Sequence, residues 1–298
     1  MTTEYISGIS IENWLTLLRQ RVESSEPDLI DIFETYAAEA KFGRAFINDD
    51  LKELPRGSLL LEVGAGAMIL SCQLIREGFS VSALEPTGTG FSHFERLRCL
   101  VLECASTLNC KPSYIQTAAE DLDSKSIFDF AFSVNVMEHV NDVGNVLERV
   151  GTSLKLGAKY RFTCPNYYFP YEPHFNIPTL FSKKLTEKFF NRRIFESSDV
   201  LDPVGVWDSL NWINVTQIKK FQKRTEGFEV QFNRSFLVSI IERIGTDREF
   251  ALRRSPLMRG FLLWIVKLHL HKIAVLIPVI TQPVIDCAIT RISIEEVS

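Results

Sequence analysis

Apolar residues recur every three to four positions in two stretches near the N-terminus. The first is 11–22, where Trp14 and Leu18 share one side, and the second is 28–46. This spacing matches the 3.6-residue period of an amphipathic helix. We therefore expect residues 1–54 to form a helical cap that ends close to the turn signal Pro55-Arg56-Gly57.

From residue 58 the pattern changes to short, continuous apolar runs separated by stretches with helical spacing. The runs cover 58–63, 79–85, 113–118, 128–135 and 159–164. Parallel strands covered by helices on both faces have this composition, because each strand is buried on both sides. The pattern predicts an α/β fold with a doubly wound, mostly parallel sheet in a domain that spans 55–240. Residues 227–232 read as one more strand.

The segment 165–178 has neither a helical nor a strand period. It contains four prolines and five aromatic residues and follows the last of the predicted parallel strands. Ligands of open α/β sheets bind at the carboxyl ends of the strands, and long loops in compact domains are often lids or binding segments. We therefore expect 165–178 to be the substrate loop.

The C-terminal part, 241–298, is predicted to be a helical extension that is both apolar and basic. Ser255-Pro256 fits an N-cap followed by proline at the first helical position, which would open a helix that runs to about 272. A bilayer-spanning helix is disfavoured, because Lys267 and Lys272 lie inside the apolar stretch and an ionised lysine at the bilayer centre costs about 2.5–3.5 kcal/mol.

Two interpretations of this extension stay open. It is either a buried helix that completes the core or a dimer face, or an interfacial helix that brings 253–281 against anionic lipid. The second interpretation rests on local charge, since the window 248–272 has a net charge of +5. Its charged residues are Arg248, Glu249, Arg253, Arg254, Arg259, Lys267 and Lys272.

Composition narrows the class of protein. The 298 residues are 46% hydrophobic and 23% charged, with a formal net charge of −4, which is typical of a globular protein and leaves no overall positive field for a nucleic-acid partner. The six cysteines form no CxxC pair and no zinc-like spacing with histidine, so we expect reduced thiols and no metal site. The N-terminus lacks the features of a secretory signal, so we expect a cytoplasmic location.

The clearest candidate for chemistry is the sequence LLEVGAGAM at 60–68, where a predicted strand hands over to a helix. Gly64 and Gly66 permit a tight turn and a close approach to a ligand. A dinucleotide fingerprint would need a third glycine at position 69, which is Ile69, so a nicotinamide-dependent oxidoreductase is disfavoured. Glu62 at the end of the strand suits a ligand that carries an ammonium group.

This segment resembles the first motif of the class I S-adenosylmethionine-dependent methyltransferases, an acidic residue followed by x-G-x-G. The resemblance spans about 58–166 and implies S-adenosylmethionine as the cofactor. By that resemblance, Glu85 would chelate the ribose hydroxyls, Pro86 would lie near the adenine, Glu120 would accept from its exocyclic amine, and Asn135 would lie beside the methyl group. The implied cofactor-binding residues are Glu62, Gly64, Ala65, Gly66, Glu85, Pro86, Glu120 and Asn135.

Departures from the family pattern bear on the acceptor. Met68 replaces a glycine that the family often has, and the N-P-P-Y tetrad of amino-group methyltransferases is absent, which disfavours nucleobase amines. His139 and His174 are the candidate catalytic bases, because histidine titrates near neutral pH and both follow predicted strands. We expect methylation of a small-molecule, glycan or lipid-linked acceptor, on oxygen. The alternative is a non-catalytic protein that keeps this fold to bind another protein, and an oligomer is compatible with either.

Overall fold

The computed structural model describes residues 9–86, 92–198, 200–247, 250–251 and 256–293. The chain divides into two compact units. The first comprises 1–134 with 148–161, and the second comprises 135–147 with 162–298.

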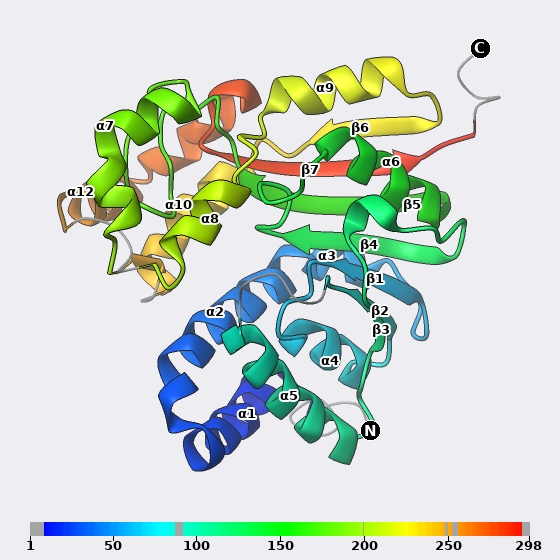
Figure 1. The fold of residues 1–298 in the computed structure, drawn as a ribbon. Helices are drawn as coiled ribbons and strands as arrows, with labels where there is room; N and C mark the ends of the chain where they lie inside the picture. The colour runs from blue at the N-terminus through cyan, green and yellow to red at the C-terminus, as the bar shows by residue number, and fades with distance from the viewer. Residues whose placement is uncertain (1–8, 87–91, 199, 248–249, 252–255, 294–298) are drawn as a thin grey trace. The chain divides into compact units, whose positions relative to one another are not determined.

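The elements follow one another in the order shown by colour in Figure 1. The α-helices are α1 (Ile11–Ser25), α2 (Ile30–Phe46), α3 (Asn48–Lys52), α4 (Ile69–Arg76), α5 (Ser92–Thr107), α6 (Val143–Ser153), α7 (Lys183–Phe195), α8 (Pro203–Ser209), α9 (Val215–Arg224), α10 (Phe236–Thr246) and α12 (Pro256–Lys267). The strands are β1 (Leu59–Val63), β2 (Ser80–Leu84), β3 (Ser113–Ile115), β4 (Phe128–Val134), β5 (Leu154–Pro165), β6 (Phe228–Phe232) and β7 (Val284–Arg291). Short 3-10 helices are η1 (Pro27–Leu29), η2 (Ala119–Asp121), η3 (Leu270–Leu276) and η4 (Val279–Thr281).

The strands form a mixed sheet in the order β3-β2-β1-β4-β5-β7-β6. β1 pairs in parallel with β2 and with β4, and β2 pairs in parallel with β3. β6 and β7 are antiparallel, with Val230 opposite Ile289. The predicted α/β class with a mostly parallel, doubly wound sheet is therefore confirmed.

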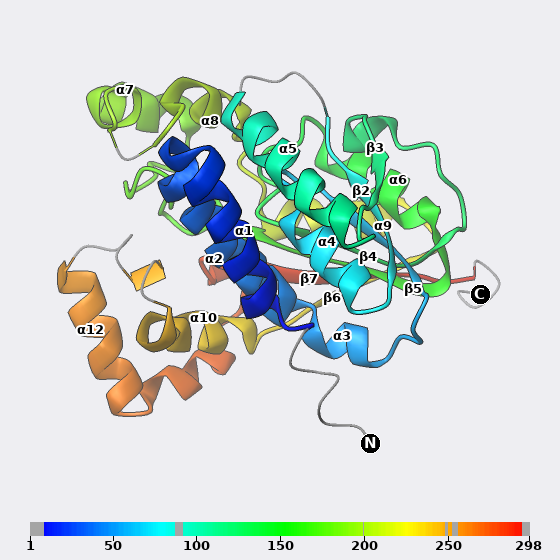
Figure 2. The same ribbon diagram turned by 90° about the horizontal axis from the view of Figure 1, so that it is seen from below.

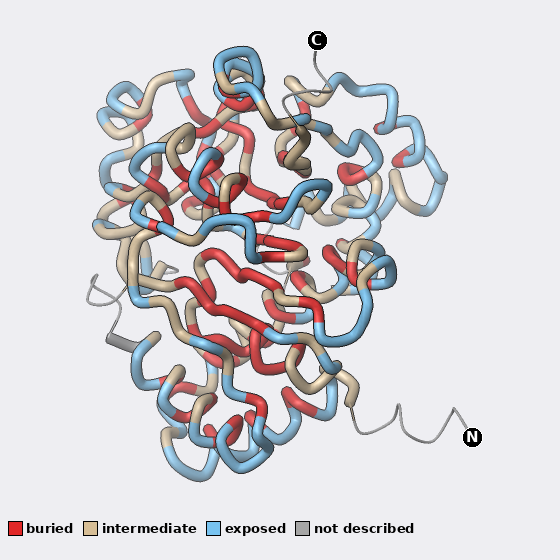
Figure 3. The backbone as a smooth tube through the Cα atoms, turned by 90° about the vertical axis from the view of Figure 1, so that its right-hand side faces the viewer, coloured by how far each residue is buried: buried red, intermediate tan, exposed pale blue. Residues whose placement is uncertain are grey.

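The N-terminal helices of the first unit are where the 3.6-residue period predicts them. α1 begins after Ser10, whose hydroxyl accepts the N–H of Asn13, and it buries Trp14 and Leu18. The indole of Trp14 donates to the carbonyl of Ile69 at 3.0 Å, which ties α1 to the start of α4. α1 lies beside α2 and α5 (Figure 2). The residues of β1, β2 and β4 are mostly buried, and Figure 3 shows the buried parts of the chain in red.

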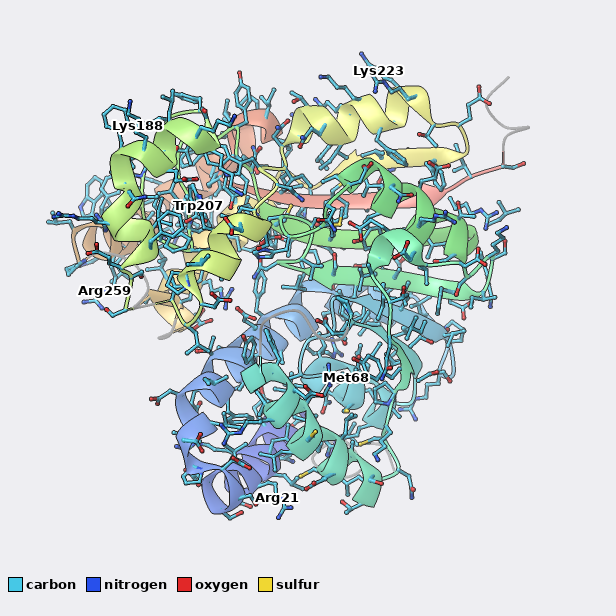
Figure 4. All side chains as sticks on the ribbon, in the orientation of Figure 1. Arg21, Met68, Lys188, Trp207, Lys223 and Arg259 are labelled. Atoms are coloured by element: carbon cyan, nitrogen blue, oxygen red, sulfur yellow. The ribbon has the colours of Figure 1, made fainter. Side chains whose placement is uncertain are left out.

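The second unit has an aromatic core. Trp207 is fully buried and meets the rings of Phe175 and Trp212 edge-on, and Trp212 stacks on Tyr167 with ring centroids 5.2 Å apart. Trp207 is labelled in Figure 4. This cluster joins the loop that follows β5 to α8 and to the segment after it.

The C-terminal part departs from the prediction of one long helix. α12 begins at Pro256 as expected but ends at Lys267, because His269 has a left-handed φ of 56° and the chain continues as the 3-10 helix η3. The expected N-cap Ser255 lies outside the described residues. The described chain contains no helix that is both long enough and apolar enough to cross a membrane.

Candidate functional site

The loop after β1 has the backbone that its glycines predict. Gly64 and Gly66 have φ values of 71° and 49°, a region that residues with a Cβ rarely adopt. The N–H groups of Gly64 and Ala65 both donate to the carbonyl of Leu84 at the end of β2. Met68, labelled in Figure 4, is fully buried and also left-handed with φ of 60°, so it takes the backbone conformation that a glycine would adopt more easily.

Glu85 is in direct contact with this loop. Its Oε2 accepts the N–H of Gly66 at 2.9 Å. The contact follows from the sheet, because β1 and β2 are neighbouring parallel strands and their carboxyl ends lie side by side. Burial raises the pKa of the Glu85 carboxyl, while the Gly66 hydrogen bond and the positive charge of Arg98 partly oppose that rise.

Glu62 is a buried carboxyl next to the last residue of β1. Burial raises its pKa to about 8; the hydrogen bond donated by the Ser71 hydroxyl opposes the rise and the negative charge of Glu85 adds to it. A buried, protonated carboxyl ionises more readily when a cation binds beside it, because the positive charge stabilises the carboxylate. The residue therefore fits the ammonium group that the sequence analysis assigned to it.

Pro86, Glu120 and Asn135 are the remaining predicted cofactor residues. Pro86 is half-buried directly after Glu85, and Glu120 is half-buried in η2. Asn135 is exposed with a left-handed φ of 54°, and its N–H donates to the carbonyl of Thr163 at 2.9 Å. Their contacts with adenine and with the methyl group stay predictions.

In the second unit, the expected loop 165–178 is irregular but firmly tied. The side-chain amide of Asn166 donates to the carbonyls of Ile280 and Gln282. The N–H of Tyr167 donates to the carbonyl of Ile213 at 2.9 Å. These bonds anchor the loop to distant parts of the chain. They therefore favour a fixed binding segment over a lid that opens and closes.

His174 belongs to a hydrogen-bonded pair inside this loop. Its Nδ1 lies 2.6 Å from Oε1 of Glu172, whose side chain has no solvent exposure. Glu172 also accepts from the hydroxyl of Tyr167 and from the N–H groups of His174 and Phe175. Burial opposes ionisation of Glu172, but the hydrogen bond and charge of the His174 side chain, followed by the N–H groups of Phe175 and His174, hold its pKa below the usual value. The carboxylate therefore orients the ring with Nδ1 protonated, which leaves the lone pair of a neutral imidazole on Nε2.

His139 lies beside His174, with ring centroids 5.4 Å apart. Its Nδ1 is 2.8 Å from the Ser209 hydroxyl, and that hydroxyl donates its own hydrogen to the carbonyl of Val206. Nδ1 of His139 must then be the donor, so Nε2 carries its lone pair. Burial, and next the neighbouring His174, lower the pKa of His139 to about 3, which makes it a neutral hydrogen-bond acceptor but a weak base.

Asn211 holds the segment that carries His139. Its side-chain amide donates to the carbonyls of Met137 and Val140 at 2.8 Å and 2.7 Å, and its N–H donates to the carbonyl of Glu138 at 2.8 Å. Three bonds from one residue thus fix residues 137–140. The sequence analysis did not identify Asn211, because nothing in the local pattern links two segments about seventy residues apart.

Glu138, His139 and His174 bring one ligand atom each within 4.8 Å of one another. Among the described residues this is a group that could hold a metal ion, since carboxylate and neutral imidazole are common ligands. The adjacent residues Glu138 and His139 could have indicated a metal site from the sequence. Their proximity to His174 becomes apparent only in the folded loop. The sequence analysis also missed Ser71 and Glu172, which act on residues that it did name.

The mixed sheet and the glycine loop agree with the fold that the sequence resemblance implied. Over 103 residues, 33% of this chain and 36% of the relative, it is 30% identical to the ubiquinone biosynthesis O-methyltransferase of Rhodopseudomonas palustris. The chain belongs to one family with the uncharacterized proteins MT1557 and Rv1509 of Mycobacterium tuberculosis, to which it is 45% identical over 94% of its own length and 95% of theirs. No protein-family model matches it.

Among solved structures, similar chains include phosphoethanolamine N-methyltransferase 2 of Haemonchus contortus, with 16% identity, a TM-score of 0.47 and coverage of 93% of this chain and 60% of that one. Another is a putative sarcosine dimethylglycine methyltransferase of Galdieria sulphuraria, with 14% identity, a TM-score of 0.47 and 88% coverage of both chains.

Proposed function

We propose that the protein transfers a methyl group from S-adenosylmethionine to an oxygen of a small-molecule, glycan or lipid-linked acceptor. The observation that carries the proposal is the contact between Glu85 and the N–H of Gly66, beside the buried carboxyl of Glu62. Two carboxyls and a glycine turn at the ends of adjacent parallel strands suit a ligand that has both vicinal hydroxyls and an ammonium group. The local similarity to O-methyltransferases supports oxygen as the methylated atom.

The residues present fit this cofactor by their chemistry. Glu62 would meet the ammonium group, Glu85 the ribose hydroxyls, and Gly64, Ala65 and Gly66 would let the backbone approach closely. Pro86, Glu120 and Asn135 complete the proposed set. When bound, the sulfonium supplies an activated methyl group, so the protein has to orient the acceptor oxygen and take up its proton.

We assign that proton to Nε2 of His174. The Glu172 carboxylate fixes the ring and stabilises the imidazolium that forms, which is the role of the acidic member in a Ser-His-Asp triad. His139, as a neutral acceptor, would orient the acceptor hydroxyl through Nε2. Chain continuity supports these roles, since β4 ends five residues before His139 and β5 leads into the loop that carries His174, and ligands bind where such strands end.

The test is transfer of label from methyl-labelled S-adenosylmethionine into separated lipid, glycan and small-molecule fractions. The proposal expects label in one fraction, none with His174→Gln, and normal transfer with His269→Gln, which changes an exposed histidine. Binding of the cofactor should be the same in all three proteins. Cofactor binding without transfer into any fraction would instead support a non-catalytic protein.

A further inference from the structure

The described residues of the C-terminal extension present an unusually apolar surface. Eleven of the twenty-two exposed large apolar side chains in the described chain fall within 257–277. We name these eleven residues the C-terminal apolar surface: Leu257, Met258, Phe261, Leu263, Trp264, Leu268, Leu270, Ile273, Val275, Leu276 and Ile277. Monomeric proteins seldom expose so many large apolar side chains in one contiguous segment without a partner.

On α12 three of the five exposed large apolar residues lie on one side of the helix. Leu257, Phe261 and Trp264 are spaced by four and three positions, so they form one stripe along the helix, and they are 88%, 56% and 54% exposed. The rings of Phe261 and Trp264 are stacked with centroids 6.4 Å apart. The half-buried Leu262 and Val266 point to the other side, and α12 has no buried residue among those described.

Hydrogen bonds anchor the segment that carries this surface. His271 is buried, and its Nε2 lies 2.8 Å from Oε1 of Glu242 on α10. Gln282 donates to the carbonyls of Ile277 and Arg234. α12, η3 and α10 lie together in both ribbon views (Figures 1 and 2). The exposed side chains therefore belong to an anchored segment.

The charges of this segment indicate which kind of partner the C-terminal apolar surface binds. Residues 256–285 contain no Asp or Glu, whereas they contain Arg259, Lys267 and Lys272. Arg259 is half-buried on α12 and labelled in Figure 4, and the two lysines are exposed. A two-fold dimer through this surface would bring the cations of both copies together with no acid from the segment to balance them. An anionic bilayer offers both an apolar interior and a negative surface.

We propose that the C-terminal apolar surface docks in the interfacial layer of an anionic phospholipid bilayer, with Trp264 and Phe261 inserted among the lipids and Lys267 and Lys272 at the headgroups. This inference goes beyond methyl transfer and does not depend on it. It places α12 and η3 at a membrane surface.

The test is co-sedimentation of the full chain with vesicles. Vesicles of phosphatidylcholine and phosphatidylglycerol in equal parts should carry the protein down at low salt, and pure phosphatidylcholine should carry down much less. Phe261→Ser/Trp264→Ser and Lys267→Glu/Lys272→Glu should each lower the partition coefficient at least about tenfold. Leu156→Ser, which changes an apolar side chain that is 66% exposed on β5, should bind like the native protein.

Tryptophan emission provides a second readout. Trp14 and Trp207 are fully buried and Trp212 is half-buried, so the exposed Trp264 should account for a blue shift on adding anionic vesicles. Trp264→Phe should keep most of the binding and lose that shift. The proposal is overturned if the native protein stays in the supernatant at low salt, if Phe261→Ser/Trp264→Ser binds as well as native, or if sedimentation velocity without lipid shows a dimer that this double variant dissociates.

Discussion

Glu172 and His174 form a hydrogen bond of 2.6 Å between Oε1 and Nδ1, and the carboxylate makes it from a position with no solvent exposure. The bond fixes which nitrogen of the ring holds the hydrogen. A catalytic base that is oriented in this way needs no rearrangement when the hydroxyl group of the methyl acceptor binds.

Replacing this carboxylate should therefore affect catalysis more than cofactor binding. Glu172→Gln should lower kcat by about 10²–10⁴-fold, because the amide can neither fix the ring in the same way nor stabilise an imidazolium. Steady-state kinetics and cofactor titration measure the two effects separately. Glu196→Gln, at an exposed position of the same unit, is the control and should match native. A folded Glu172→Gln protein with native kcat would refute the role of the pair.

The raised pKa of Glu62 predicts a pH-dependent affinity. Below about pH 8 the free protein holds a proton on Glu62, and an arriving ammonium group favours its release. The affinity for S-adenosylmethionine should therefore rise with pH, by up to about tenfold per unit, and level off near the pKa of Glu62. Calorimetry in two buffers with different ionisation enthalpies measures the released proton.

Two controls isolate the cause of this proton release. Glu62→Gln should bind S-adenosylmethionine more weakly and release no proton from this position. Methylthioadenosine lacks the amino-acid part of the cofactor, so its affinity for the native protein should change little over the same pH range. Equal proton release with both ligands would contradict the assigned contact.

Glycine at position 66 should be required for two separable reasons. A Cβ there would lie 3.2 Å from Cε1 of Phe94, and the backbone φ of 49° disfavours any other residue. Gly57→Ala is a matched control, since Gly57 has a φ of 85° but nothing within 4 Å of an added Cβ. Both variants should lose about 1–2 kcal/mol of unfolding free energy from backbone strain, but only Gly66→Ala should weaken cofactor binding. Equal cofactor affinity of the two variants would contradict the claim that the loop after β1 binds the cofactor.

Asn211 should act on activity through the segment it holds. Asn211→Ala leaves the carbonyls of Met137 and Val140 without these donors, which should cost about 1–3 kcal/mol of unfolding free energy. Because His139 lies between these two residues, kcat should also fall at temperatures where the variant is fully folded. Thermal unfolding followed by circular dichroism sets that temperature. A folded variant with native kcat would leave Asn211 a purely structural role.

Much of the first unit was predictable because local sequence patterns determine its helices and strands. Continuous apolar runs located β1, β2 and β4, and chain order placed Glu85 near the glycine loop once parallel neighbours were assumed. β5 begins at Leu154, five residues earlier than the predicted run from 159, because its outer half is exposed and mixed in polarity.

The second unit was harder to predict because its site depends on contacts between distant segments. Ser209, Asn211 and His139 meet only after about seventy intervening residues have folded. β7 went unrecognised because Asp286, Thr290 and Arg291 interrupt its apolar pattern, although the antiparallel pairing with β6 makes it regular. Glu172 looked like one polar residue in an aromatic loop until its four donors were visible.

The central claim is that the loop after β1 and the carboxyl of Glu85 hold S-adenosylmethionine, and calorimetric titration tests it most directly. The native protein should bind the cofactor with micromolar affinity, and Glu85→Ala should bind about ten- to a hundredfold more weakly, because hydrogen bonds to a charged group are lost. Glu95→Ala, which changes an exposed carboxylate on α5, should bind like native. Absence of binding by the native protein at millimolar cofactor would contradict the account.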